Sequence, residues 1–218
     1  MAFAEVTASL ISQFEAIVGP ENIFVDDEKR YDYSHDKTEN YSFLPDVIVK
    51  PGTPEEVSAL MKLCSENNIP VTPRGAGTGL AGGSLPIHKG LVISMERFNK
   101  ILNIDELNLQ ATVEPGVITE VFQNAAKEKG LFYPPDPASS GSCFIGGNVS
   151  NNSGGPKAVK YGVTRDYVLS LQVVLPTGEI IWTGANVLKN STGYNLTQLM
   201  CGSEGTLGII TKIIFKLR

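Results

Sequence analysis

The sequence of 218 residues has few cysteines, few histidines and no long apolar run, and each shortage excludes a class of protein. Three cysteines, none in a Cys-x-x-Cys pair, make neither a disulfide framework nor a zinc site, and they suit a reducing compartment. The only histidines are His35 and His88, so we expect no bound metal. No apolar run approaches the ~18 residues of a membrane span, so we expect a cytoplasmic protein without a transmembrane segment.

Basic charge is also scarce. The chain has 18 Lys and Arg against 23 Asp and Glu, a net charge of −5, and its basic residues form no run. This balance argues against a surface for nucleic acid. With 42% hydrophobic and 19% charged residues the composition is that of a globular protein, which excludes disorder and coiled coil.

Glycine, in contrast, is abundant: the 22 glycines make up about a tenth of the chain, against a usual ~7%. Fourteen of them lie in three short stretches, 75–83, 141–162 and 202–208. Glycine has no Cβ and adopts positive φ freely, so backbone N–H groups in such loops can approach another molecule closely. The clustering therefore predicts a bound ligand.

The first part of the chain, residues 1–105, has an α/β pattern. Residues 47–49 read as a short buried strand, and 69–72 as another. Between them, Thr53-Pro54-Glu55-Glu56 is a strong helix start, because Thr53 can cap the helix, Pro54 suits its first turn and Glu56 completes a capping box. This order predicts a βαβ unit with a parallel pair of strands.

The second part, residues 106–218, has an antiparallel pattern. The apolar runs 168–175 and 180–182, joined by a Pro-Thr-Gly-Glu turn, predict a β-hairpin, and 208–217 reads as a long last strand. We therefore expect an α+β protein of two lobes, a small α/β lobe with parallel strands and a larger antiparallel α+β lobe. Because the sequence stops directly on the last strand, we expect it to be a fragment of a longer chain.

The first glycine cluster contains a literal Gly-x-Gly-x-x-Gly, from Gly77 to Gly82, behind a predicted strand. A Rossmann site requires a helix directly after this motif, and the Gly-Gly-Ser-Leu-Pro that closes the cluster at 82–86 cannot form one. We interpret the cluster instead as a nest of backbone N–H groups that binds an anion with help from Arg74.

The second cluster runs over 134–155 and is closed by 161–166, and the third is 202–208. The second is long for an unstructured connection, and such loops are usually functional. Its Asn and Ser side chains and free amides offer hydrogen bonds to the edge of a heterocycle. Both clusters therefore strengthen the expectation of a bound cofactor.

Four segments of the sequence together resemble the FAD-binding domain of the vanillyl-alcohol oxidase superfamily, the PCMH-type fold. They are residues 73–79, 134–139, 146–155 and 202–208. Within it they are most similar to the glycolate oxidase and D-lactate dehydrogenase branch of FAD-linked oxidases. The resemblance spans roughly residues 40–218. It implies that the first cluster holds the pyrophosphate, that the second lies along the pyrophosphate, ribityl chain and flavin, and that the start of the last strand lies near the adenine. The cofactor-binding residues it implies are Pro73, Arg74, Gly75, Ala76, Gly77, Thr78, Gly79, Leu80, Pro135, Asp136, Ala138, Ser139, Gly141, Gly146, Gly147, Asn148, Asn152, Ser153, Gly154, Gly155, Gly162, Gly208 and Ile209.

The resemblance also implies an activity, the oxidation of a 2-hydroxy acid such as glycolate or D-lactate by hydride transfer to FAD. Relatives carry a further C-terminal domain that supplies the substrate pocket and the catalytic base. We therefore expect no catalytic residue in this chain, and we expect an electron acceptor or partner subunit, with the larger complex peripheral to a membrane. Two alternatives stay open: another enzyme of this flavin fold, of the alkyl-glycerone-phosphate synthase or sugar oxidase kind, or a non-catalytic flavin-binding subunit.

Three side chains have both a chemical and a plain interpretation, and the first glycine cluster lacks the side chain that links FAD in many relatives. Many relatives link FAD to a histidine in the first cluster, where this chain has Ala76-Gly77-Thr78, so we expect non-covalent FAD. Cys143 lies near the place of a cysteine link in some relatives, but it also reads as a small core residue. His35 and Asp136 could act as acids or bases. We interpret the first as a surface side chain and the second as a residue that shapes its proline-rich loop.

Overall fold

The structure is a computed structural model that describes residues 3–218. It contains two compact units, Met1–Arg97 with Val174–Ile180, and Phe98–Val173 with Ile181–Arg218. The division at Phe98 lies N-terminal to the boundary expected near residue 105, and the turn of the predicted hairpin belongs with the first unit.

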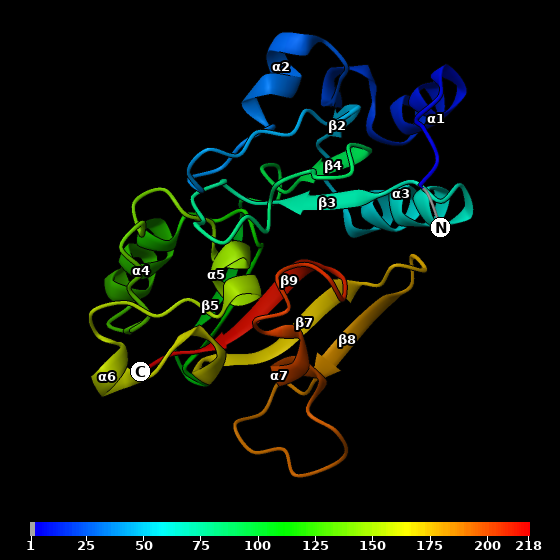
Figure 1. Cartoon of the computed structure of the whole chain (residues 1–218). Helices are drawn as coiled ribbons and strands as arrows, with labels where there is room; N and C mark the ends of the chain where they lie inside the picture. The colour runs from blue at the N-terminus through cyan, green and yellow to red at the C-terminus, as the bar shows by residue number, and fades with distance from the viewer. Residues whose placement is uncertain (1–2) are drawn as a thin grey trace. The chain divides into compact units, whose positions relative to one another are not determined.

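Unit 1 is built on a four-stranded sheet in the order β1–β2–β4–β3, and Figure 1 labels β2, β4 and β3 side by side. β2 and β3 both pair with β4 in parallel, so the strands of the predicted βαβ unit are parallel but separated by β4. Every residue of β2 and β4 is buried, as in parallel strands covered on both faces. The elements are α1 (Ala8–Val18), η1 (Pro20–Asn22), β1 (Ile23–Phe24), α2 (Asp27–Asp32), β2 (Val47–Val49), α3 (Pro54–Glu66), β3 (Val71–Arg74) and β4 (Leu91–Ser94).

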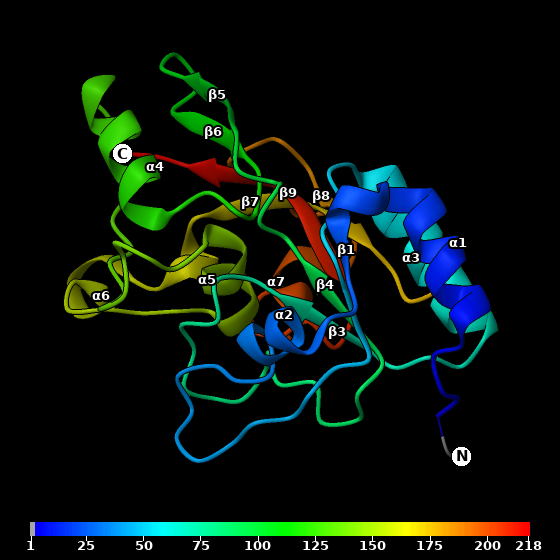
Figure 2. The same cartoon turned by 90° about the horizontal axis from the view of Figure 1, so that it is seen from above.

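Helix α3 begins as the sequence predicts. The Thr53 side chain accepts a hydrogen bond from the Glu56 N–H at 3.2 Å. The Glu56 carboxylate reaches one residue further back than in a simple capping box, to the N–H of Gly52 at 2.7 Å. The apolar face of α3 is buried, and α1 lies beside it (Figure 2).

The turn at 174–180 packs on the same helix. Ser58 of α3 donates a hydrogen bond to the Gly178 carbonyl at 2.5 Å. Gly178 has φ +83°, and a Cβ there would lie 2.3 Å from Lys62 Cγ. This close approach requires glycine.

Unit 2 is built on a five-stranded sheet in the order β5–β6–β9–β7–β8. β6 pairs antiparallel with both β5 and β9, which confirms the antiparallel character expected of this part of the chain. The last strand of the sequence therefore lies at the centre of the sheet rather than at its edge. The elements are β5 (Ile101–Asp105), β6 (Gln110–Val113), α4 (Thr119–Glu128), α5 (Ile145–Asn151), α6 (Ala158–Tyr161), η2 (Thr164–Asp166), β7 (Val168–Val174), β8 (Ile180–Gly184), α7 (Leu196–Met200) and β9 (Ile209–Lys216).

An aromatic cluster forms the centre of unit 2. The Phe122 ring of α4 lies 5.6 Å from the Phe215 ring of β9, and Tyr133 packs on both, at 4.8 and 4.9 Å. All three side chains are at most 1% exposed. α4 is thereby fixed on the sheet, and the buried Tyr133, which follows the helix in sequence, directly precedes the second glycine-rich segment. No helix within residues 3–218 is long and apolar enough to cross a bilayer.

Candidate functional site

The first glycine cluster is a loop that follows β3 directly. No helix forms between β3 and β4, which confirms that the Gly-x-Gly-x-x-Gly is not a Rossmann site. The backbone N–H groups of residues 76–81 have no hydrogen-bond acceptor among residues 3–218. A row of free amides in a glycine-rich loop is suited to binding an anion.

Arg74, at the start of this loop, is only 7% exposed. Its guanidinium donates to the His35 carbonyl at 2.7 Å and to the Tyr33 carbonyl at 3.4 Å, and it lies 5.3 Å from the centre of the Tyr33 ring. Burial lowers the pKa of Arg74, and the negative charge of Asp36 opposes that shift. The Arg74 side chain thus has protein partners on the inner side of the loop.

Gly77 explains how tightly the loop lies on Arg74. It has φ +68°, and a Cβ there would lie 2.4 Å from the Arg74 Nη2. The positive φ favours glycine, and any side chain here would also displace the Arg74 guanidinium from its place. The cluster is therefore folded over a buried positive charge.

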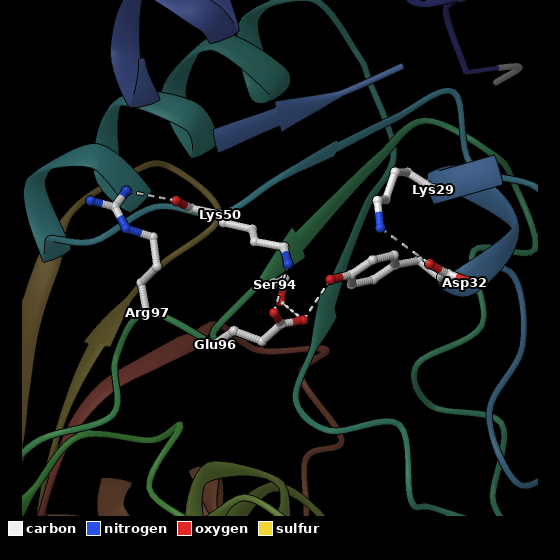
Figure 3. A network of polar contacts seen from close by, with 7 residues as sticks. Lys29, Asp32, Lys50, Ser94, Glu96 and Arg97 are labelled. Carbon is white, nitrogen blue, oxygen red and sulfur yellow. Dashed lines mark hydrogen bonds and ion pairs between the residues drawn. The ribbon is translucent and has the colours of Figure 1, made fainter. Parts of the chain in front are cut away.

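A second polar group lies where β2 and β4 end (Figure 3). The Glu96 carboxylate accepts from Lys50 at 2.6 Å, from the Tyr33 hydroxyl at 2.5 Å and from the Ser94 hydroxyl at 3.0 Å. Burial raises the pKa of Tyr33, and its bond to Glu96 acts in the same direction. Burial opposes the charged form of Glu96, but the hydrogen bonds from Lys50 and Tyr33 prevail and hold the Glu96 pKa below its ordinary value.

The second glycine cluster is partly helical, which differs from the expected loop. Residues 145–151 form α5, because the Ile145 N–H donates to the Val117 carbonyl and the Gly146 N–H to the Pro115 carbonyl, both at 2.8 Å. A Cβ on Gly146 would lie 2.4 Å from Pro115 Cβ, so glycine lets the helix pack against this turn. These contacts are long-range, and a local pattern cannot reveal them.

Gly147, the next residue, has a different environment. It stands in the first turn of α5 without a positive φ, and a Cβ there would meet no described atom within 4 Å. Glycine is the poorest helix former after proline, so neither geometry nor packing explains it. The open space beside Gly147 could accept a bound group.

Asn148 points into the interior instead. It is 3% exposed, and its Nδ2 donates to the Thr119 hydroxyl of α4 at 2.6 Å. The same hydroxyl lies 3.2 Å from the Cys143 Sγ. This buried group ties α5 to α4, and it places Cys143 in the core, with 4% exposure, in agreement with its plain interpretation.

The proline-rich part of the cluster is held to its glycine-rich part. A Cβ on Gly155 would lie 1.9 Å from the Asp136 carbonyl oxygen, which leaves room for glycine alone. The Asp136 carboxylate pairs with Lys157 at 2.8 Å. Asp136 therefore shapes the segment.

The segment that ends the cluster joins α5 to the third cluster. The Asn152 side chain, at a left-handed residue, accepts from the Arg165 N–H at 2.9 Å. The Arg165 guanidinium donates to the Cys201 carbonyl at 3.0 Å, and the Gly202 N–H donates to Val149 of α5 at 3.0 Å. Within unit 2 the structure thus brings together α5, 152–165 and the start of the third cluster.

Other predicted site residues differ in their burial and backbone conformation. Gly208 and Ile209 are buried at the beginning of β9, Leu80 is exposed in the first loop, and Gly162 has φ +88° against the Asp166 carboxylate. His35 is exposed, and its ring contacts that of Tyr31. Residues 3–218 contain no cluster of three His, Cys, Asp or Glu side chains placed to hold a metal ion.

Comparison with known proteins gives one family and several long relatives. Residues 45–184 match the family described as FAD binding domain. The chain is 49% identical to the glycolate oxidase subunit GlcD of Bacillus subtilis (strain 168) over 97% of its length, and 48% identical to the D-lactate dehydrogenase of Anaerostipes hadrus over 99%. It covers 45% of each of these relatives, so it spans less than half of their length.

The fold matches that of solved structures. A solved alkyldihydroxyacetonephosphate synthase aligns with 99% of this chain at a TM-score of 0.85 and 27% identity, and the aligned region covers 44% of that protein. The match includes the parallel sheet of unit 1 and the antiparallel sheet of unit 2, and it confirms the predicted fold class.

Proposed function

Because the chain belongs to the family of FAD binding domains, we propose that it holds FAD without a covalent link, through the backbone of its glycine-rich segments. The observation that carries this proposal is the row of N–H groups at 76–81 that lack acceptors among the described residues. Such groups compensate the charge of a pyrophosphate through their dipoles, with no need for a lysine. The buried guanidinium of Arg74 beneath the loop adds positive charge of its own.

The other glycine-rich segments fit the same cofactor. The space beside Gly147 is open, and the N–H of this residue, in the first turn of α5, has no acceptor among residues 3–218. Asp136 and Gly155 hold the segment around it in a fixed shape. We therefore propose that the cofactor-binding residues implied by the resemblance act mainly through their backbone, and that Arg74 and Asn148 act by holding the backbone in place.

For the whole protein we propose the oxidation of a 2-hydroxy acid of the glycolate or D-lactate type. The names of two relatives at 48–49% identity, a glycolate oxidase subunit and a D-lactate dehydrogenase, support this substrate class. FAD supplies the hydride acceptor when it is bound. This chain supplies the cofactor's binding and orientation, and we propose that the base that takes the hydroxyl proton lies in a part of the protein beyond this chain. We also propose a cytoplasmic complex, peripheral to a membrane, with an electron acceptor or partner subunit.

A second candidate is an enzyme of the alkyldihydroxyacetonephosphate synthase kind. The structural match at a TM-score of 0.85 favours it, but the identity of 27% is far below that to the 2-hydroxy acid enzymes. The two candidates differ in whether a 2-hydroxy acid reduces the flavin.

The test uses the full-length protein loaded with FAD. Adding glycolate or D-lactate without oxygen should bleach the flavin absorption, with the protein lacking substrate as control. No bleaching with any 2-hydroxy acid would contradict the proposed activity. The 218-residue chain alone should bind FAD without turnover, and robust turnover by it would show that the base lies within residues 1–218.

A further inference from the structure

The segment Tyr33–Thr38, between α2 and the start of β2, lies against the first glycine loop; we call it the brace. Arg74, at the start of the loop, donates to the carbonyls of Tyr33 and His35. Ser84, at its end, donates to the Asp36 carboxylate at 3.0 Å. The brace therefore holds the loop from both sides.

Thr38 makes the contact to the loop's own backbone. Its hydroxyl oxygen accepts a hydrogen bond from the Gly82 N–H at 3.0 Å. Thr38 is itself fixed, because its N–H donates to the Asp36 carboxylate at 2.7 Å. Asp36 thus positions Thr38 with one oxygen and Ser84 with the other, and it is 9% exposed.

The brace also explains how a positive charge can lie beneath the loop. Arg74 is buried, and the charge of Asp36 favours its protonated form. Gly77 lies directly over the guanidinium. The loop is thereby anchored at both ends, while the amides of 76–81 stay unpaired among the described residues. A loop that is already ordered loses less conformational entropy when it binds a ligand.

We propose that the brace preorganises the glycine loop for the pyrophosphate of the cofactor, and that Thr38 is a positioning residue for that group. This inference rests on the proposed binding of FAD. Thr38 offers a clean test, because Thr38→Val keeps the shape of the side chain and removes the acceptor for Gly82, whereas Thr38→Ser keeps the acceptor. Thr177→Val, which removes an exposed hydroxyl elsewhere in unit 1, is a matched control.

The experiment measures two quantities in the same variants. Amide exchange, followed by NMR in the cofactor-free chain, should show that Gly82 loses protection in Thr38→Val and keeps it in Thr38→Ser. Titration calorimetry should show a Kd for FAD and for ADP raised by about 3- to 10-fold in Thr38→Val, the effect of one net hydrogen bond. Thr38→Ser and Thr177→Val should stay within twofold of the wild type. ADP separates the pyrophosphate from the flavin, so both ligands should weaken by the same factor.

Each outcome has one reading. If the wild-type chain binds FAD and ADP and Thr38→Val binds them equally well, the brace is not a positioning element, although the proposed function stands. Equal losses in Thr38→Val and Thr38→Ser would likewise overturn the role of the hydroxyl. If the wild-type chain binds neither ligand, the proposed function fails and the inference fails with it.

Discussion

Two neighbouring glycines in the first turn of α5, Gly146 and Gly147, have different physical environments. A side chain at Gly146 would collide with Pro115, whereas one at Gly147 would meet no described atom within 4 Å. The first glycine is explained by the packing of this chain. The second has no such explanation among residues 3–218, and we attribute it to the proposed cofactor.

This contrast predicts opposite results for two alanine variants. Gly146→Ala should lower the free energy of unfolding by ~1–3 kcal/mol, because the helix must shift from Pro115. Gly147→Ala should leave it unchanged or raise it by up to ~1 kcal/mol, since alanine favours the helix. The Kd for FAD should nevertheless rise in Gly147→Ala. Urea unfolding without cofactor and fluorescence titration with FAD measure the two effects, and unchanged FAD binding in Gly147→Ala would contradict our placement of the cofactor.

At the scale of elements, Glu96 connects the ends of β2 and β4 to Tyr33 of the brace through Lys50, Ser94 and the Tyr33 hydroxyl. Because these bonds lower the pKa of Glu96 in the folded chain, the folded state binds the proton less well than the unfolded state. The stabilisation is therefore present above the ordinary glutamate pKa of 4.5 and is lost as the pH falls through the folded pKa.

Glu96→Gln should accordingly be less stable than the wild type at pH 7, and the difference should shrink as the pH falls below 4.5. Urea midpoints across this pH range measure the difference. Glu66→Gln, at the exposed last residue of α3, is the control. Its urea midpoint should differ little from that of the wild type across this pH range. If the difference in urea midpoint between Glu96→Gln and the wild type stayed constant with pH, the charge of Glu96 would not be the source of its stabilisation.

Elements with strong local signals could be predicted from the sequence, and those made by distant contacts could not. The start of α3 at Thr53-Pro54 and the hairpin turn at 176–179 carry their signal within a few residues. The place of β4 between β2 and β3 depends on sheet pairing that no local pattern records. Helix α5 likewise forms in a sequence with two adjacent glycines because Val117 and Pro115 accept its first N–H groups.

At the scale of the whole molecule, the fold and the cofactor class could be predicted because several long glycine-rich motifs stand in the same order as in the family that they resemble. The brace could not be predicted, for a physical reason. Tyr33, Asp36 and Thr38 read as a polar loop, and their partners Arg74, Gly82 and Ser84 lie about 40 residues or more away. The only local sign is the Asp-x-Thr spacing, in which a carboxylate can accept from the second following N–H.

The chemistry of the three cysteines bears on how the whole chain holds its cofactor. Burial raises the pKa of Cys64 to about 12 and that of Cys201 to about 11, so neither thiol forms a nucleophilic thiolate readily. Cys143 is buried with its Sγ beside Thr119. With no histidine in the first glycine loop, the chain has no suitable group for a flavin link there.

We therefore expect the chain purified with FAD to show, after denaturation, the mass of the unmodified polypeptide. In the native state iodoacetamide should modify none of the three thiols, whereas the unfolded chain should react at all three, which is the control for reagent activity. A flavin-sized addition to the denatured chain would contradict non-covalent binding, and its position by peptide mapping would identify the residue that carries it.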